Sequence, residues 1–401
     1  MHLRLGAAQD RDGWGQPVFL RRRSMYQEES FKTQRVVYAH TRSDEGDMEY
    51  KMHCHDVYEV YYMISGNAEY LLEGKTTRDK MWCRPDSFFT RNGVTVKAGV
   101  LATTLDAGDR TVRLSTGEWL AYDRLLAATG SRPFVPPIPG LETVERTFCF
   151  QTLSDASALA EALRPESRVL ILGAGLTGVK CAEGIRGLCA QIAIADLAPR
   201  VLPAVLDDTA AAMVQARMEE KGVRFYLNDS AAAFRGNTAR LQSGTELEFD
   251  VLVTAVGVRP NTQLVADAGG AVDRGILVDG RCATTLPDVY AAGDCAQGYD
   301  AVSGEKRMLP LWPNAMLQGE TAGINMAGGR ADYTQGIALN ASGVFGLHMI
   351  TAGSYEGESF TVQRDGSYKR LVTADGVLKG VIMVGDVSRA GIYTDLIRKK
   401  K

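Results

Sequence analysis

The clearest pattern of hydrophobic and polar positions lies between residues 168 and 196. The run Arg168 to Leu172 is largely apolar, as a buried parallel strand requires. Apolar residues then recur at helical spacing from Leu176 to Leu188, and a second short strand is predicted from Ile192 to Ala195. The pattern therefore predicts a strand–helix–strand unit of an α/β fold with a parallel sheet.

The segments that follow extend this unit. Asp207 to Lys221 has the pattern of an amphipathic helix, and Val223 to Tyr226 that of a strand. Phe249 to Val256 predicts another buried strand, and Asn314 to Met326 predicts a later helix.

The flanking regions have the shorter period of strands. Alternation from Val94 to Leu126, interrupted by turn residues, predicts a small antiparallel meander. Further short strands are expected at Gln34 to His40, as a hairpin within Glu59 to Glu73, and around Val344 to Ile350 and Gly376 to Val384.

Glycines follow the first strand of the central unit at G-x-G-x-x-G spacing: Gly173, Gly175 and Gly178. The first permits a tight turn, the second lets backbone approach a pyrophosphate, and the third lets the helix pack on the strand. The helix N-terminus then offers free N–H groups to phosphates. The alternative is a glycine-rich turn without a ligand, but the complete strand–helix–strand context favours dinucleotide binding.

Asp196 ends the second strand and is placed to accept hydrogen bonds from an adenosine ribose. The same carboxylate would repel the 2′-phosphate of NADPH, so we expect a preference for NADH. Arg200, four residues on, could reduce that preference by reaching a 2′-phosphate.

Composition adds few constraints. The 401 residues are 45% hydrophobic and 23% charged, with a net charge of −3, which argues against a general nucleic-acid or membrane-surface binder. The seven cysteines are scattered without a C-x-x-C pair, as reduced thiols in a cytoplasmic protein would be.

The first 75 residues have a different character. His53, His55, Glu59 and Gly66 follow an H-x-H-x-x-x-E-x6-G pattern, which resembles the first motif of cupin barrels. The second cupin motif, with its third histidine, is absent, so the resemblance describes a partial, β-rich cupin-like segment. Histidines without a bound metal are the favoured interpretation, and no metal site is predicted.

The motifs ATGSRP, GAGLTG, AVGVRPN and VYAAGDCA occur in that order over residues 70 to 401, which resembles the pyridine nucleotide-disulfide oxidoreductase superfamily. The segment LKGVIMVGDVSRAGIYTDLI is similar to the C-terminal domain of NADH-rubredoxin reductases and of the FAD region of nitrite reductases. The resemblance implies FAD and NAD(H) as cofactors, held by two Rossmann-like domains.

The resemblance also implies a domain organisation. Residues 1–75 form the cupin-like segment, 76–150 with 273–330 an incomplete FAD domain, 151–272 the NAD domain, and 331–401 a small α+β C-terminal domain. Further cofactor-binding residues are implied at motif positions, which are Thr129, Gly130, Gly257, Gly293, Asp294 and Asn314. For Asp294, which would bind ribityl or pyrophosphate oxygens, the alternative is a helix cap.

Three departures from the family pattern narrow the function. Residues 1–75 contain no G-x-G-x-x-G unit for FAD, no redox cysteine pair is present, and Lys180 stands where disulfide reductases have glutamate. We therefore expect hydride transfer from NADH through FAD to an acceptor such as rubredoxin, a nitrite-reductase-type centre or a small molecule. The alternative is a non-catalytic NAD(H)-binding protein that has lost FAD. The catalytic residues stay unassigned, and a homodimer stays open.

Overall fold

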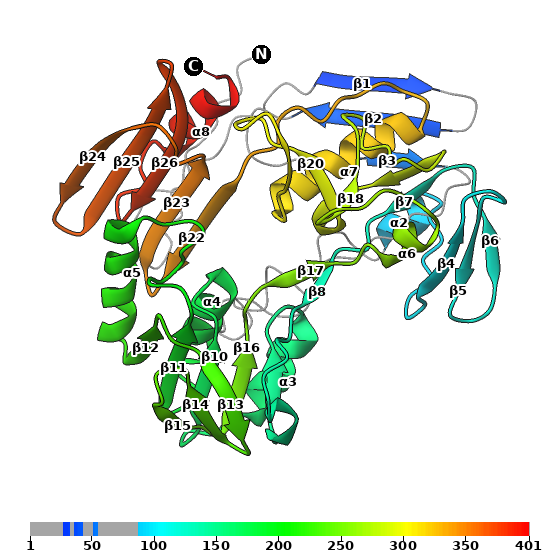
Figure 1. Ribbon diagram of the computed structural model, residues 1–401. Helices are drawn as coiled ribbons and strands as arrows, with labels where there is room; N and C mark the ends of the chain where they lie inside the picture. Colours follow the sequence, from blue (N-terminus) through cyan, green and yellow to red (C-terminus); the bar gives the residue numbers. More distant parts are fainter. Residues whose placement is uncertain (1–26, 33–35, 43–50, 55–86, 401) are drawn as a thin grey trace, which may run out of the picture.

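The computed structural model describes residues 27–32, 36–42, 51–54 and 87–400. Figure 1 shows a parallel sheet with its helices at the bottom of the view, a C-terminal sheet at upper left and several small sheets at upper right. The mixed α/β class predicted from the hydrophobic pattern is confirmed.

The parallel sheet has the strand order β12-β11-β10-β16-β9. Its strands are β9 (Thr147–Cys149), β10 (Arg168–Leu172), β11 (Gln191–Asp196), β12 (Val223–Leu227) and β16 (Val251–Thr254). Three helices accompany them, α3 (Leu153–Ala162), α4 (Leu176–Ile185) and α5 (Asp208–Glu220). All four predicted strands and both predicted helices of the extended unit are present, with ends that differ by a few residues.

Successive residues of β10 point into different cores, as the two-residue period of a strand requires. Val169 and Ile171 pack with the residues of α4 and α5, whereas Leu170 and Leu172 pack with Phe234 and Phe249. The second core lies under a three-stranded antiparallel sheet of β13 (Ala231–Arg235), β14 (Thr238–Leu241) and β15 (Glu246–Glu248).

The C-terminal sheet is antiparallel throughout, in the order β22-β23-β26-β25-β24. It consists of β22 (Leu339–Val344), β23 (Leu347–Gly353), β24 (Glu358–Arg364), β25 (Ser367–Ala374) and β26 (Val377–Val384), and α8 (Ala390–Arg398) contacts β23 and β26. The short strand expected around Val344 to Ile350 corresponds to β23, which begins three residues later, at Leu347. Phe345 and Gly346 have positive φ angles of 48° and 80°, so the chain turns there and forms a hairpin.

Helix α5 joins the parallel sheet to the C-terminal sheet. Val214 of α5 shares one buried cluster with Met349 and Ile382 of the C-terminal strands. Asp207, the N-cap of α5, accepts hydrogen bonds from Tyr368 Oη at 2.7 Å and Arg370 Nη1 at 3.2 Å. Polar and apolar contacts therefore both fix the C-terminal sheet against the nucleotide-motif unit.

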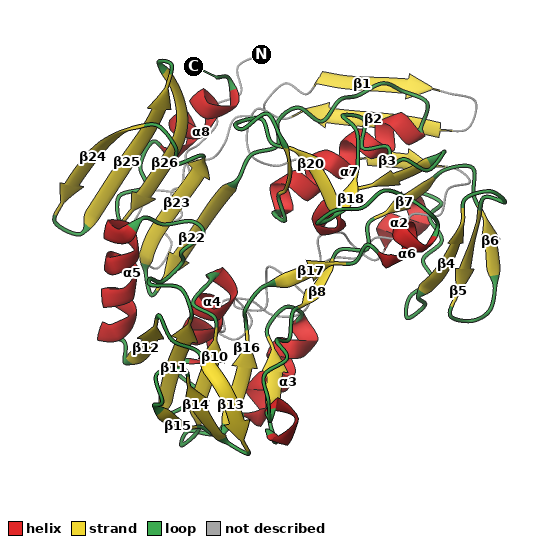
Figure 2. Cartoon of the chain, in the orientation of Figure 1, coloured by secondary structure: helices red, strands yellow, loops and turns green. Residues whose placement is uncertain are grey.

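The remaining elements form small sheets (Figure 2). The predicted meander is present. Strand β7 pairs with β19 in parallel, and β8 pairs with β17 antiparallel, at the point where the chain passes between the two nucleotide regions, here called the β8–β17 crossing. The bounds are β4 (Ala102–Asp106), β5 (Thr111–Leu114), β6 (Trp119–Ala121), β7 (Leu125–Ala127), β8 (Ser131–Pro133), β17 (Val258–Pro260), β18 (Ile276–Leu277), β19 (Val289–Ala291), β20 (Ala296–Tyr299) and β21 (Lys306–Met308). The helices are α2 (Ser87–Arg91), α6 (Gln263–Asp267) and α7 (Trp312–Met326).

Three strands near the N-terminus pair in sequence order: β1 (Gln27–Lys32), β2 (Val36–Arg42) and β3 (Lys51–Cys54). Strand β2 overlaps the strand predicted at Gln34 to His40. The hairpin predicted at Glu59 to Glu73 and the cupin-like positions His55, Glu59 and Gly66 lie outside the described residues.

Candidate functional site

The glycine turn after β10 is built so that two of its glycines cannot be replaced. Gly173 has φ +109°, and a Cβ there would collide with the carbonyl of Ala255. A Cβ on Gly178 would collide with the carbonyl of Gly173, so the helix packs closely on the turn. By contrast, a Cβ on Gly175 would meet no described atom within 4 Å. The turn is therefore tight on its protein side and open above Gly175.

Helix α4 starts directly at this opening. Its N-cap is Gly175, and no side chain of the described residues caps it. The first N–H groups of the helix therefore lie free beside the open space, as an anion-binding helix terminus requires. These residues fit the pyrophosphate of a dinucleotide.

Asp196 lies half-buried at the end of β11, beside the same turn. Its carboxylate accepts from Ala174 N at 2.5 Å and from Ala198 N at 2.7 Å, one bond on each oxygen. Each oxygen has a further lone pair, so ribose hydroxyls can still bind. Arg200 is held elsewhere, since its Nε donates to Leu206 O at 3.1 Å and its Nη1 lies 3.1 Å from Asp208.

A second group of predicted residues meets where β8 crosses β17. Asn261 binds Thr129 through two hydrogen bonds, from Thr129 Oγ1 to Asn261 O at 2.5 Å and from Asn261 Nδ2 to Thr129 O at 2.8 Å. Asn261 N also donates to Gly130 O at 2.8 Å, and Gly257 O accepts from Phe134 N at 2.9 Å. The structure thus brings Thr129, Gly130 and Gly257 into one crossing.

Asp294 is connected to the β8–β17 crossing through Ser131. Ser131 Oγ donates to Asp294 Oδ2 at 3.0 Å, and Gln151 Nε2 donates to Ser131 O at 3.1 Å. Burial raises the pKa of the Asp294 carboxyl, and the Ser131 hydroxyl opposes that rise. Gln151 Oε1 is buried and has no hydrogen-bond partner among the described residues, so an acceptor is left over at this point. A half-buried carboxylate and a spare acceptor suit a ligand that carries hydroxyl groups.

The two groups of residues are connected through one short segment. Ala255, whose carbonyl closes over Gly173, is only two residues before Gly257 in the crossing. The glycine turn after β10 and the residues around Asp294 are therefore linked through the short segment from Ala255 to Gly257.

The segment Asn314 to Gln318, which the resemblance implied to open a helix facing the flavin, lies in the first two turns of α7. Helix α7 begins at Trp312, with Pro313 in its first turn, and no described side chain caps it. Asn314 is buried, and its Nδ2 donates to Ile337 O at 2.9 Å, so the side chain fixes a loop. Gln318 Oε1 accepts from Gly293 N at 2.7 Å and ties α7 to the turn that carries Asp294.

Lys180 lies on α4, two residues beyond Gly178, and points to the C-terminal sheet. Its Nζ lies 2.6 Å from Glu183 Oε2 and 2.5 Å from Gly343 O. Glu183 Oε1 in turn accepts from Phe345 N at 2.5 Å. The pair therefore anchors the β22–β23 turn to the nucleotide helix.

Four of the described cysteines are poorly suited to thiol chemistry. Cys181, Cys189, Cys282 and Cys295 are buried, and burial raises the pKa of each thiol, to about 11 for Cys189 and about 12 for Cys282. Thiols held protonated in this way are weak nucleophiles.

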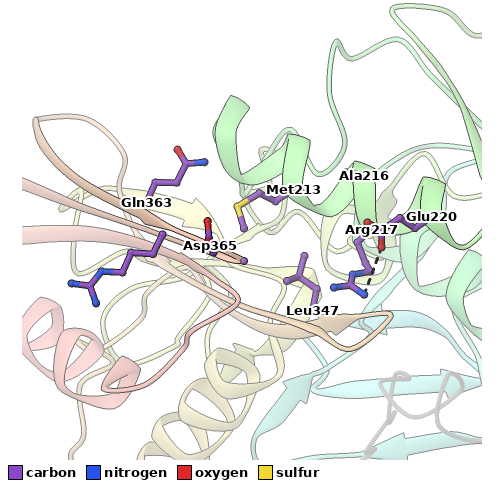
Figure 3. A pocket seen from close by; sticks show the side chains of 9 residues that line it. Met213, Ala216, Arg217, Glu220, Leu347, Gln363 and Asp365 are labelled. Carbon is purple, nitrogen blue, oxygen red and sulfur yellow. Dashed lines mark ion pairs between the residues drawn. The ribbon is translucent and has the colours of Figure 1, made fainter.

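A cavity of about 440 Å³ lies between α5 and the end of β24, and it shares no residue with either group above. Figure 3 shows Met213 and the Arg217–Glu220 pair on the helix side, with Gln363 and Asp365 opposite. Its lining is mixed in charge and holds no residue of the nucleotide motif, so we do not assign it to the cofactors.

The sequence patterns missed Ser131 and Gln151. Ser131 stands within the ATGSRP motif, so its position was a usable signal, whereas only the folded chain brings Gln151 to it. In the described part of the chain no group of three His, Cys, Asp or Glu side chains could hold a metal ion, and no helix is long and apolar enough to cross a bilayer.

The parallel sheet, the glycine turn and the carboxylate at the end of β11 define a dinucleotide-binding protein of the α/β class. The profile of one family, pyridine nucleotide-disulphide oxidoreductase, matches residues 33–319. The chain belongs to the pyridine nucleotide-disulphide oxidoreductase family, and the resemblance inferred from the motifs is confirmed.

Relatives agree with this assignment. The chain is 33% identical over 344 residues to an NADH-dependent phenylglyoxylate dehydrogenase subunit epsilon from Aromatoleum evansii, covering 82% of this chain and 81% of the relative. It is 28% identical over 262 residues to a rubredoxin-NAD(+) reductase from Pseudomonas putida, covering 64% and 68%. It spans less than half of an assimilatory nitrate reductase electron transfer subunit and a nitrite reductase from Bacillus subtilis, 44% and 42% of their lengths.

Among solved structures, a putidaredoxin reductase–putidaredoxin complex has a chain that matches with a TM-score of 0.78 at 22% identity, covering 83% of each chain. This similarity shows the fold. Family and relatives together establish an oxidoreductase, a flavoprotein whose cofactors are FAD and NAD(H). They decide against the alternative of a non-catalytic binding protein.

Proposed function

We propose that the enzyme passes a hydride from NADH to FAD across the β8–β17 crossing and delivers the electrons to a redox-protein acceptor. The observation that carries the proposal is the direct connection from the glycine turn, through Ala255 and Gly257, to the Ser131–Asp294 pair. A donor nucleotide and a flavin held at these two groups would lie on either side of one short crossing.

The proposal assigns roles to the chain's own residues. Gly173, Gly175 and Gly178 with the start of α4 bind the NADH pyrophosphate, and Asp196 binds its adenosine ribose. Thr129, Gly130, Gly293 and Asp294 face the FAD, with Ser131 and Gln151 positioning the Asp294 carboxylate. FAD, when bound, accepts the hydride as a two-electron carrier and can release electrons singly.

A domain division accompanies these roles. We propose that residues 151–272 bind NADH, that 76–150 with 273–330 bind FAD, and that 331–401 form the C-terminal domain. The parallel sheet β12-β11-β10-β16-β9 falls within the first of these units apart from β9, and the five-stranded antiparallel sheet falls within the last.

The acceptor is proposed to be a protein. The supporting similarity is to a subunit of an NADH-dependent dehydrogenase and to a rubredoxin-NAD(+) reductase, whose name pairs NAD(+) with rubredoxin. Rubredoxin and a nitrite-reductase-type centre are both of this class, and a small molecule is the remaining possibility.

Replacing the cysteines tests the proposal that electrons pass from NADH to FAD and the acceptor without a cysteine thiol. Because four of the described thiols are buried with raised pKa values, changing all seven cysteines to serine should leave FAD-dependent NADH oxidation with an artificial acceptor within about threefold of wild type. A thermal-unfolding measurement separates lost stability from lost chemistry. Loss of turnover in a folded single-cysteine variant would refute the proposal.

A further inference from the structure

Two arginines stand directly opposite each other in the β8–β17 crossing, which Figure 1 shows between the parallel sheet and the small sheets. Arg132 of β8 and Arg259 of β17 are register partners, so their side chains leave the same face of the two strands. Both residues are exposed, and neither forms an ion pair within the described part of the chain. Because opposed like charges destabilise an antiparallel pair, the stability of the two strands does not explain this arrangement.

The two guanidinium groups are oriented by different neighbours on this face. Arg132 Nη1 donates to Asn261 Oδ1 at 2.9 Å. The guanidinium carbon of Arg259 lies 4.5 Å from the centre of the Phe134 ring. Asn261 lies toward one end of the paired strands and Phe134 toward the other, so the two side chains turn away from each other. Most of their N–H donors therefore have no acceptor among the described residues.

The arginine face of the crossing is not the face that meets Asp294. Side chains alternate between the two faces of a strand. Ser131, the neighbour of Arg132, is buried and donates to Asp294 Oδ2 at 3.0 Å. The arginines therefore lie on the opposite, solvent-facing side of the two strands, and a ligand there would leave the Ser131–Asp294 pair in place.

The charge and shape of the arginine pair select the ligand. A guanidinium group binds an oxyanion best through two parallel N–H groups. A carboxylate has a single charge and two oxygens, so it would satisfy one arginine and leave the other charge unbalanced. A phosphate group carries a charge of about −1.5 to −2 at pH 7 and three acceptor oxygens. It can therefore bind and neutralise both arginines at once.

We propose that Arg132 and Arg259 bind a phosphate group, free or carried by a small molecule other than the two nucleotide cofactors, on the solvent-facing side of the β8–β17 crossing. Binding turns both guanidinium groups toward the ligand and removes the repulsion between them, so it stabilises the crossing. The proposal goes beyond the proposed function and does not depend on it.

Calorimetric titration with phosphate tests the site. The protein is first saturated with FAD and NAD(+), so that the glycine turn after β10 is occupied, and the ionic strength is held constant. Inorganic phosphate and glycerol 3-phosphate should then each bind at one site per chain. Glycerol should not bind, and acetate should bind at least about tenfold more weakly than phosphate. Equal affinities for the two phosphates would indicate that the phosphate group alone is recognised, and tighter binding of glycerol 3-phosphate would indicate an ester.

Substitutions test the two arginines separately. Arg132→Gln and Arg259→Gln should each raise the dissociation constant for phosphate at least about tenfold, because each removes charge-assisted hydrogen bonds. Arg259→Lys keeps the charge but not the fork of donors, so its affinity should lie between that of Arg259→Gln and the wild type. Arg224→Gln, which removes an exposed arginine of β12, is the matched control and should keep the wild-type affinity.

Thermal unfolding separates loss of the site from loss of the fold. Without phosphate, the two glutamine variants should unfold at the wild-type temperature or above it, since the repulsion is gone. Added phosphate should raise the unfolding temperature of the wild type and of Arg224→Gln, but not of the glutamine variants.

Three results would overturn the proposal. One is a wild type without saturable phosphate binding below about 10 mM. Another is a pair of glutamine variants that bind phosphate within twofold of the wild type. The third is phosphate that is displaced by raising the concentration of FAD or NAD(+), because its site would then be that of a cofactor.

Discussion

At the scale of single residues, we propose that Asp196 sets the preference of the enzyme for NADH over NADPH. Its carboxylate is fixed at a strand end by Ala174 N and Ala198 N, whereas Arg200 is engaged with Leu206 and Asp208. A 2′-phosphate at this position would meet a like charge and lose the ribose hydrogen bonds. Together these effects are worth about 2–3 kcal/mol, or about a hundredfold preference for NADH.

Substitution of Asp196 should reduce that preference. Asp196→Ala should weaken the binding of NADH and improve the binding of NADPH relative to NADH. Asp196→Asn keeps a hydrogen-bond acceptor for the turn, so it should have the same effect on binding with less loss of protein stability. Titrating each variant with NADH and with NADPH gives the two dissociation constants, and their ratio measures the preference. Arg200→Ala is the matched control and should keep the wild-type ratio. Tighter NADPH than NADH binding by the wild type would contradict the assignment.

Asp294 gives a pH dependence of stability. Burial raises its pKa in the folded protein, so the folded state favours the protonated carboxyl. The stability it contributes is therefore fully present below the unfolded-state pKa of about 3.9 and is lost as pH rises through the higher folded-state value. Without bound cofactor, Asp294→Asn should be more stable than wild type at pH 7, with the difference shrinking towards pH 4.

Urea unfolding at the two pH values measures this difference. Asp332→Asn, a change at an exposed aspartate, is the control for the general effect of removing one carboxylate. An Asp294→Asn variant that lost stability relative to wild type as pH rose would show that ionised Asp294 is stabilised in the fold.

At the scale of elements, a largely buried ion pair within the nucleotide helix α4 binds the β22–β23 turn through hydrogen bonds to Gly343 O and Phe345 N. The side chains of Lys180 and Glu183 are 18% and 8% exposed, and Glu183 also holds Phe345 N. Removing one partner leaves a buried charge without its counter-ion, which costs about 3 kcal/mol.

Lys180→Met should therefore lower the free energy of unfolding by about that amount. Adding Glu183→Gln removes the uncompensated charge and keeps an acceptor for Phe345 N, so the double variant should recover most of the loss. Denaturant unfolding measures both. Lys399→Met, which breaks an exposed pair with Asp395, is the control and should cost less than about 1 kcal/mol. Equal effects of the two lysine changes would contradict the role of burial.

The sequence predicted the elements whose hydrophobic period was long and regular. Strand β10 and helices α4 and α5 lie close to their predicted positions because apolar residues recur there without interruption. Strands β13 to β15 have few large apolar residues and were missed. The turn at Phe345 was also missed, although Gly346 beside it, with a φ angle of 80°, is a usable turn signal.

The candidate site was predictable where one local motif carries it. Glycine spacing and Asp196 belong to a single strand–helix–strand unit, so the sequence places them together. The Gln151–Ser131–Asp294 chain joins residues up to 163 positions apart, and the buried role of Asn314 depends on a loop after α7. Such contacts are set by tertiary packing, which one-dimensional patterns do not encode.

At the scale of the whole molecule, the two nucleotide groups differ in completeness. The NADH group has a glycine turn, an uncapped helix and a ribose acceptor. For FAD, residues 1–75 supply no glycine triplet. Each charge-assisted bond to a pyrophosphate contributes about 1.5–3 kcal/mol. Loss of two or three such bonds would weaken FAD binding about a thousandfold. Assays should therefore supply FAD in excess.

The most direct test of the account is an anaerobic titration of the FAD-saturated protein with NADH, followed by flavin absorbance. The account predicts that one NADH bleaches one protein-bound flavin, in wild type and in the cysteine-free variant alike, because the hydride passes directly between the two nucleotides. Free FAD with NADH and no protein sets the background. NADH that binds the protein while the bound flavin stays oxidised would contradict the account.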